Sequence, residues 1–237
     1  MKRLEILKRI RNLPYPVFTI ADAVRLIPEK RTNIHVYLNR MKKDGLVYEI
    51  ERGKYTVVTD PVQIATSLIQ PSYISFLSGM SLRGMTDQIT TKLQVVATRQ
   101  KNEIQFQGMR IQFIRFKRSR VFGFEKIKRG RFDVFLAEPE KLIIDSLYMP
   151  KHTPVSEVFK ALQDSKLDGS RLLEYAKRMD SKVTSKRLGY LLDLLGSDYS
   201  KELAISRKLE VLNPSKRRKG EVDKKWKLII NEVLENA

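Results

Sequence analysis

The N-terminal architecture follows from two adjacent stretches: residues 32–45 read TNIHVYLNRMKKDG, and residues 46–58 read LVYEIERGKYTVV. Ile34, Leu38 and Met41 repeat at helical spacing, which predicts an amphipathic helix ended by the glycine that closes the first stretch. The second stretch alternates apolar and polar residues on both sides of an Arg-Gly pair, which is typical of a β-hairpin. A helix followed at once by such a hairpin is the second half of a winged helix-turn-helix.

The residues before this helix complete the motif. Two apolar-periodic segments, 4–10 and 20–27, are each closed by a proline, which lacks the amide donor that a helix interior needs. Thr19 is expected to cap the second segment, with Asp22 in its first turn. Residues 1–60 are therefore predicted to form a winged helix-turn-helix domain.

The charge of the chain indicates a polyanionic partner. Its 237 residues include 46 Lys and Arg against 27 Asp and Glu, a net charge of +19. Such an excess favours nucleic acid, and a winged helix places its third helix in the major groove and its hairpin on phosphate. Double-stranded DNA is the predicted partner, although some winged helices dock proteins instead. The predicted DNA-binding residues are Lys30, Arg31, Thr32, Asn33, Tyr37, Arg40, Lys43, Arg52 and Lys54.

The remainder, residues 61–237, is predicted to be a mixed domain, so the whole chain is expected to be α+β. A two-residue period between residues 93 and 136 predicts a small, mostly antiparallel sheet in an α/β part over 61–150. The part over 151–237 is expected to be mainly helical. The expected helices are 62–69, 73–84, 154–164, 169–179, 185–195 and 222–235.

A second basic surface is predicted within the sheet. Residues 99–131 carry 11 Lys and Arg against 2 acidic residues, interleaved with phenylalanines. This composition suits a nucleic-acid backbone, and the alternative is a phenylalanine core beneath a solvated outer face. The basic loop 213–220 either contacts phosphate or is a flexible linker. The cations of the second surface are Arg99, Lys101, Arg110, Arg115, Lys117, Arg118, Arg120, Lys126, Lys128, Arg129 and Arg131.

Several classes of protein are excluded by composition. Cysteine is absent and histidine occurs twice, which excludes zinc fingers, disulfide frameworks and thiol nucleophiles. The charged N-terminus does not resemble a signal peptide, and no run of about 18 apolar residues could span a membrane. We expect a cytoplasmic protein without a cofactor or a bound metal.

Catalytic motifs are weak throughout. Glu138, Glu140 and Lys141 resemble the acidic-x-Lys element of metal-dependent nucleases, but Pro139 and Glu140 also suit the first turn of a helix. Gly-Ser pairs like those of nucleotidyltransferases lack the two metal-binding carboxylates, and no serine nucleophile elbow is complete. The chain is predicted not to be an enzyme, with a nuclease as the less favoured alternative.

Taken in order, several motifs resemble the AbiEi family of type IV antitoxins over almost the whole chain. The most specific are the Arg-Gly-x-Tyr wing (52–55) and the Lys-Arg-Leu-Gly-Tyr-Leu-Leu helix (186–192). The others are Ser78–Gly84, Glu138–Leu142 leading into Asp145, Leu212-Asn213-Pro214, and Trp226-Lys227-Leu228 followed by Asn231. Leu82 and Arg83 depart from the alanine and histidine that are common in the first of these segments.

The resemblance implies a transcriptional regulator of a viral defence system. Its N-terminal domain would repress its own operon, and its C-terminal domain would serve antitoxicity. The toxin would be a nucleotidyltransferase-like protein that is opposed without a stable complex. A plain repressor without a toxin remains the alternative, and a neighbouring nucleotidyltransferase gene would separate the two.

Overall fold

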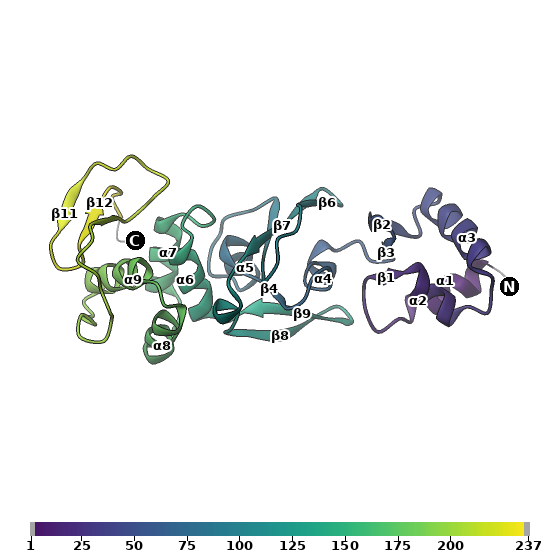
Figure 1. Ribbon diagram of the computed structural model, residues 1–237, viewed down its shortest axis with the longest axis horizontal. Helices are drawn as coiled ribbons and strands as arrows, with labels where there is room; N and C mark the ends of the chain where they lie inside the picture. Colours follow the sequence, from purple (N-terminus) through teal and green to yellow (C-terminus); the bar gives the residue numbers. More distant parts are fainter. Residues whose placement is uncertain (1–2, 235–237) are drawn as a thin grey trace. The chain divides into compact units, whose positions relative to one another are not determined.

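The structure, a computed structural model, describes residues 3–234 and is α+β (Figure 1). The described residues divide into two compact units, the first comprising 3–73, 91–115 and 126–135, and the second 74–90, 116–125 and 136–234. The chain therefore passes between the units several times, and this division differs from the one predicted at residue 60. The predicted boundary stays a prediction.

The helices and strands have the following bounds. The helices are α1 (Arg3–Arg11), α2 (Ile20–Leu26), α3 (Arg31–Lys43), α4 (Pro61–Ala65), α5 (Phe76–Leu82), the 3-10 helix η1 (Arg118–Arg120), α6 (Pro139–Tyr148), α7 (Val155–Asp164), α8 (Gly169–Met179) and α9 (Lys182–Leu194). The strands are β1 (Phe18–Thr19), β2 (Tyr48–Glu51), β3 (Lys54–Thr56), β4 (Ser72–Ile74), β5 (Lys92–Ala97), β6 (Ile104–Phe106), β7 (Met109–Arg115), β8 (Phe124–Arg129), β9 (Phe132–Ala137), β10 (Glu210–Val211), β11 (Glu221–Asp223) and β12 (Leu228–Ile230).

The N-terminal helices enclose a hydrophobic core of their own. Ile34, Leu38 and Met41 of α3 are buried in it, as their spacing predicts, together with apolar side chains of α1 and α2. Helix α2 begins with the predicted cap, in which the Thr19 hydroxyl accepts from the Asp22 amide at 3.3 Å and the Asp22 carboxylate accepts from the Thr19 amide at 2.8 Å. The short strand β1 then pairs with the hairpin in the order β1-β3-β2.

A six-stranded sheet follows, with the order β6-β7-β5-β4-β9-β8. The prediction of a mostly antiparallel sheet is wrong, because β5 runs parallel to β7 and β4 runs parallel to β9. The expected antiparallel hairpin is formed by β6 and β7. Residues 93–97 are buried without alternation, which is typical of a parallel strand covered on both faces.

Helix boundaries differ from the prediction where a local cap or strand intervenes. The segment 73–84 starts as β4 and becomes helical only at Phe76, and α4 ends at Ala65 rather than at residue 69. Helix α9 starts three residues earlier than predicted, because the Ser181 hydroxyl accepts a hydrogen bond from the Thr184 amide.

The predicted helix over 222–235 is wrong, and its last residue lies outside the described residues. Strands β11 and β12 occupy this stretch and form a small sheet with β10, in the order β10-β12-β11. The amide of Trp226 donates to the Asp223 carboxylate at 2.6 Å, and Lys227 adopts a positive φ of 54°, so the chain turns there. The apolar residues of this stretch have helical spacing although they form no helix, and Trp226 packs against Gly189 of α9 instead.

Among residues 3–234, the structure contains no helix with the length and apolar character needed to cross a bilayer.

Candidate nucleic-acid interface

Helix α3 presents one polar, basic face. Because its apolar residues pack inward, helical spacing places Thr32 and Lys43 on the opposite side with Asn33 and Arg40 beside them, and all four are exposed. Lys30, which precedes the first turn, and Arg31 are also exposed, but they lie at the two edges of the buried side rather than on this face. Of the predicted residues on and before α3, helical spacing therefore brings Thr32, Asn33, Arg40 and Lys43 together on one face.

Lys30 and the cations on this face are not neutralised by the protein. Within residues 3–234, Lys30, Arg40 and Lys43 form no ion pair, whereas the neighbouring Lys42 contacts Glu49 at 2.6 Å. The hydrogen bond between them raises the pKa of Lys42 and lowers the pKa of Glu49. The side chain of Lys30, the N-cap residue, forms no capping hydrogen bond. The positive end of the helix dipole at the start of α3 is therefore not capped by this residue.

Polar and aromatic residues predicted on α3 differ in their availability. Thr32 and Asn33 are exposed, and the Asn33 amide donates to Glu29 at 3.0 Å. Tyr37 is half-buried and packs against the N-terminal core, so only part of its ring is available for binding. Sequence spacing alone does not separate such a side chain from its exposed neighbours.

The hairpin β2–β3 carries the remaining predicted cations. Gly53 has a φ of +78° in the turn, a conformation that favours glycine, and its amide donates to Glu49 at 3.3 Å. Arg52 is exposed at the turn, but Lys54 is paired with Glu51 at 2.6 Å. Burial raises the pKa of Glu51, yet hydrogen bonds from Lys101 and Lys54 outweigh it and keep that pKa below its usual value.

The sequence-based prediction missed this role of Glu51. The pairing of Glu51 with Lys54 could have been identified from their Glu-x-x-Lys spacing. The pairing with Lys101 could not, because Lys101 is 50 residues away in the chain. Two of the cations predicted to contact nucleic acid are therefore already bound to one carboxylate.

We expect Arg52→Ala to weaken DNA binding more than Lys54→Ala. Arg52 forms no ion pair within residues 3–234 and can neutralise a phosphate directly, whereas Lys54 would first have to leave Glu51. Loss of one phosphate contact makes the negative slope of log K against log salt concentration shallower by about 0.9. Salt titrations of both variants by fluorescence anisotropy measure this slope, and an equal decrease in the two would contradict the assignment.

The cations of the predicted second basic surface are divided between the two units. Lys117, Arg118 and Arg120 belong to the second unit, and the other eight cations belong to the first. Arg120 faces inward, where its guanidinium donates to the Met179 carbonyl at 2.7 Å and to the Tyr148 hydroxyl at 2.7 Å.

Most of the other cations of this predicted surface have partners. Lys101 binds Glu51, Arg110 lies 3.8 Å from Glu103, Lys126 and Lys128 contact Asp133 at 3.3 and 2.5 Å, Arg129 contacts Asp60 at 2.9 Å, and Arg131 stacks on Phe132 at 4.5 Å. Arg99, Arg115, Lys117 and Arg118 are exposed and form no ion pair within the described part of the chain. All six phenylalanines in and next to this region are at least half-buried, and five are core residues, which fits the alternative of an apolar core.

The residues of the nuclease alternative make separate structural contacts. The Glu138 carboxylate accepts a hydrogen bond from Tyr175, and Glu140 accepts one at 2.9 Å from the backbone amide that precedes α8. Lys141 is fully buried and paired with Asp145. Within residues 3–234, no three His, Asp or Glu side chains are placed to hold a metal ion. The first-turn position predicted for Pro139 and Glu140 is confirmed.

The Lys-Arg-Leu-Gly helix segment also has a structural role. Lys186 donates to the Lys208 carbonyl, and the Arg187 guanidinium donates to the carbonyls of Leu147 at 2.9 Å and Val211 at 3.1 Å. These bonds fasten the end of α6 and the start of the small sheet to α9.

Comparison with known proteins shows the fold alone. No protein-family model matches the chain, and no curated protein matches it. Among solved structures, the chain is similar to the crystal structure of RV2827C protein from Mycobacterium tuberculosis, with a TM-score of 0.66 and 12% identity. The alignment covers 95% of this chain and 89% of that one. The fold is shared. At this identity the likeness supports the α+β architecture and says nothing of the ligand.

Proposed function

We propose that the chain is a DNA-binding transcriptional regulator whose N-terminal part is a winged helix-turn-helix. The observation that carries this proposal is the exposed face of α3, where Arg40 and Lys43 lie on the same side as Asn33 and form no ion pair within residues 3–234. Cations fix a helix on phosphates, and Asn and Arg side chains can read base edges. The hairpin adds Arg52 next to this helix in the sequence.

Two observations favour DNA over a docked protein. The charge of the first 58 residues is one-sided, with 13 Lys and Arg against 6 Asp and Glu. Centres of protein–protein interfaces are depleted of charge and enriched in apolar side chains. On the basic face of α3, the exposed large apolar side chain is Val36, at 46% exposure, which is too little for such a centre.

The direct test is fluorescence anisotropy with the DNA upstream of the protein's own gene and a scrambled duplex of equal length. We expect the upstream DNA to remain bound at salt concentrations that release the scrambled duplex, because base contacts do not depend on counterion release. Equal affinities that fall together with salt would contradict sequence readout and leave only electrostatic attraction.

Arg40→Ala should weaken binding to the upstream DNA by about 1–3 kcal/mol if Arg40 contacts a base. The matched control is Arg11→Ala, which removes from the end of α1 an exposed cation that has no ion pair in the described part of the chain. The ratio of affinities for upstream and scrambled DNA should fall for Arg40→Ala and stay constant for Arg11→Ala. A uniform loss on both duplexes would assign Arg40 to phosphate.

The antitoxin role is proposed on the resemblance to AbiEi antitoxins. It is tested by co-expressing the chain with a nucleotidyltransferase-like protein encoded next to it and measuring growth. Rescue of growth without a co-purifying complex is expected. Repression of the promoter without any rescue would favour the plain repressor.

A further inference from the structure

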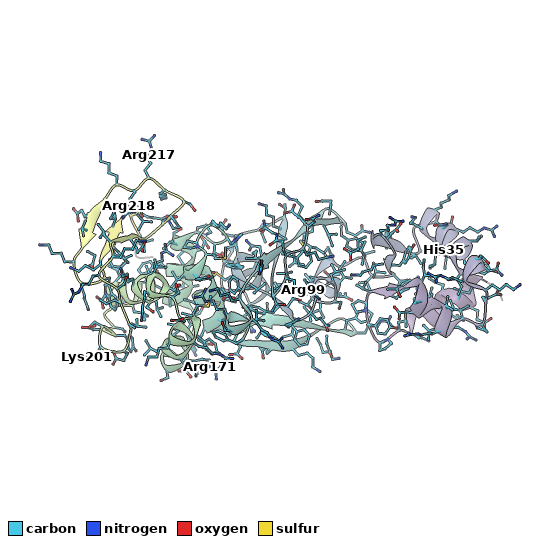
Figure 2. All side chains as sticks on the ribbon, viewed as in Figure 1. His35, Arg99, Arg171, Lys201, Arg217 and Arg218 are labelled. Atoms are coloured by element: carbon cyan, nitrogen blue, oxygen red, sulfur yellow. The ribbon has the colours of Figure 1, made fainter. Side chains whose placement is uncertain are left out.

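The loop between β10 and β11 is exposed and strongly basic. Residues 214–220 are all exposed, and Lys216, Arg217, Arg218 and Lys219 follow one another without an acidic residue. Figure 2 shows Arg217 projecting outward from the ribbon of this loop. The loop belongs to the second unit, and its sequence leaves two alternatives open, a phosphate contact or a flexible linker.

Hydrogen bonds hold this loop in one conformation, which argues against a flexible linker. The Asn231 side chain accepts from the Asn213 amide at 2.9 Å and donates to the carbonyls of Asn213 at 2.7 Å and Arg217 at 3.0 Å. The Ser215 amide donates to the Asn213 side chain at 2.8 Å. The guanidinium of Arg218 also helps to hold the loop, since it donates a hydrogen bond to the Leu209 carbonyl at 2.9 Å.

Two of the four cations, Arg217 and Lys219, have side chains with neither an acidic partner nor a hydrogen bond within the described residues. Lys216 is paired with Glu232 at 3.0 Å, whereas Arg217 and Lys219 form no ion pair within residues 3–234. Because the backbone that carries Arg217 and Lys219 is already fixed, the loop loses less conformational entropy when it binds a partner. Guanidinium and ammonium groups presented this way match phosphate oxygens, and the guanidinium can bind two of them at once.

The chemistry of the loop favours a nucleic-acid strand over a lipid surface. A membrane-binding loop usually adds aromatic or aliphatic side chains that insert between lipids, and residues 214–220 contain none. We propose that this loop binds the phosphodiester backbone of a nucleic acid, without reading its sequence and without using α3. The C-terminal half of the chain then has a nucleic-acid contact of its own.

The experiment compares two double variants of the full chain that lose the same charge. Arg217→Gln with Lys219→Gln removes the free cations of the loop but leaves Arg218 and the asparagine contacts intact. Lys201→Gln with Lys224→Gln serves as the control, since it removes two exposed lysines elsewhere in the second unit that form no ion pair with any described residue. Fluorescence of Trp226, the single tryptophan of the chain, reports that each variant is folded.

Affinities for scrambled duplex DNA and for single-stranded RNA are measured over a salt series. For the loop variant on duplex DNA, we expect the negative slope of log K against log salt concentration to become shallower by about 1.8, since each phosphate contact contributes about 0.9. A loss on RNA alone would identify RNA as the source of the phosphates. Equal losses in the loop variant and the control would overturn the proposal, as would binding to phosphatidylserine vesicles that depends on Arg217 and Lys219 without any effect on nucleic acids.

Failure of the proposed regulator function is recognised separately. The loop variant should keep the ratio of affinities for upstream and scrambled DNA, because that ratio depends on α3. If Arg40→Ala leaves this ratio unchanged while the loop variant lowers the salt slope, sequence readout by α3 fails and the loop contact stands.

Discussion

Gly189→Ala is expected to destabilise the second unit by about 2–3 kcal/mol, the cost of an overpacked core. A Cβ atom at this position of α9 would lie 2.1 Å from Cη2 and 2.2 Å from Cζ3 of Trp226. The indole cannot simply move away, because its Nε1 donates to Asp193 at 2.7 Å, one turn further along the same helix. Alanine favours a helix interior by about 1 kcal/mol over glycine, so the steric clash must outweigh this gain for the variant to lose stability.

Urea unfolding followed by Trp226 fluorescence measures this effect at the site of the clash. Gly169→Ala at the start of α8 is the control, since its Cβ would meet only the Tyr199 hydroxyl, at 3.3 Å, at the end of a side chain that can shift. We expect the control to change the free energy of unfolding by less than 1 kcal/mol or so. A Gly189→Ala variant as stable as the control would show that Trp226 is not packed on α9 as described.

Lys141→Ala is expected to destabilise the protein by about 3–5 kcal/mol, because it leaves a buried carboxylate without its cation. Lys141 and Asp145 are both fully buried, and the carboxylate also accepts a hydrogen bond from the Ser75 hydroxyl at 2.8 Å. Burial lowers the pKa of Lys141 below its usual value, although Asp145 acts in the opposite direction. The ammonium lies 4.3 Å from the centre of the Phe122 ring, which adds a cation–π contact.

A double variant separates lost pairing from lost packing. Lys141→Met with Asp145→Asn removes both charges, retains an apolar chain of similar length, and leaves Ser75 an acceptor. We expect it to recover at least half of the stability lost in Lys141→Ala, measured by urea unfolding, because replacing both partners of a buried pair is often nearly neutral. Lys177→Ala, on the exposed side of α8, controls for the loss of a surface charge. A double variant no more stable than Lys141→Ala would contradict the buried unpaired charge as the cause.

The N-terminal helices and hairpin could be predicted from the sequence because their interactions are local. The cap formed by Thr19 and Asp22 spans three residues, and the hairpin turn is set by adjacent residues. The inward face of α3 follows from a repeat that any helix must obey. Each of these elements is specified within about one turn of helix or one hairpin, so no distant contact was needed to predict it.

The errors lie where distant contacts override a local period. Val222, Trp226 and Ile229 repeat at helical spacing, yet the indole fills the space beside Gly189, and its neighbours pair as strands. The directions of β5 and β7 likewise depend on how the connecting chain returns, which a two-residue period does not encode. Propensity is a weak preference compared with the burial of a tryptophan.

For the candidate binding surfaces, the sequence established the sign and amount of charge, since net charge is additive and needs no coordinates. Which cations are free depends on acidic residues far away in the chain: Lys101 is bound to Glu51, and Arg120 is turned inward to the carbonyl of Met179. Conversely, the rigidity of the 214–220 loop comes from Asn231, beyond the loop itself. Charge belongs to composition, but its availability to a partner is set by tertiary contacts that satisfy some cations and leave others in solvent.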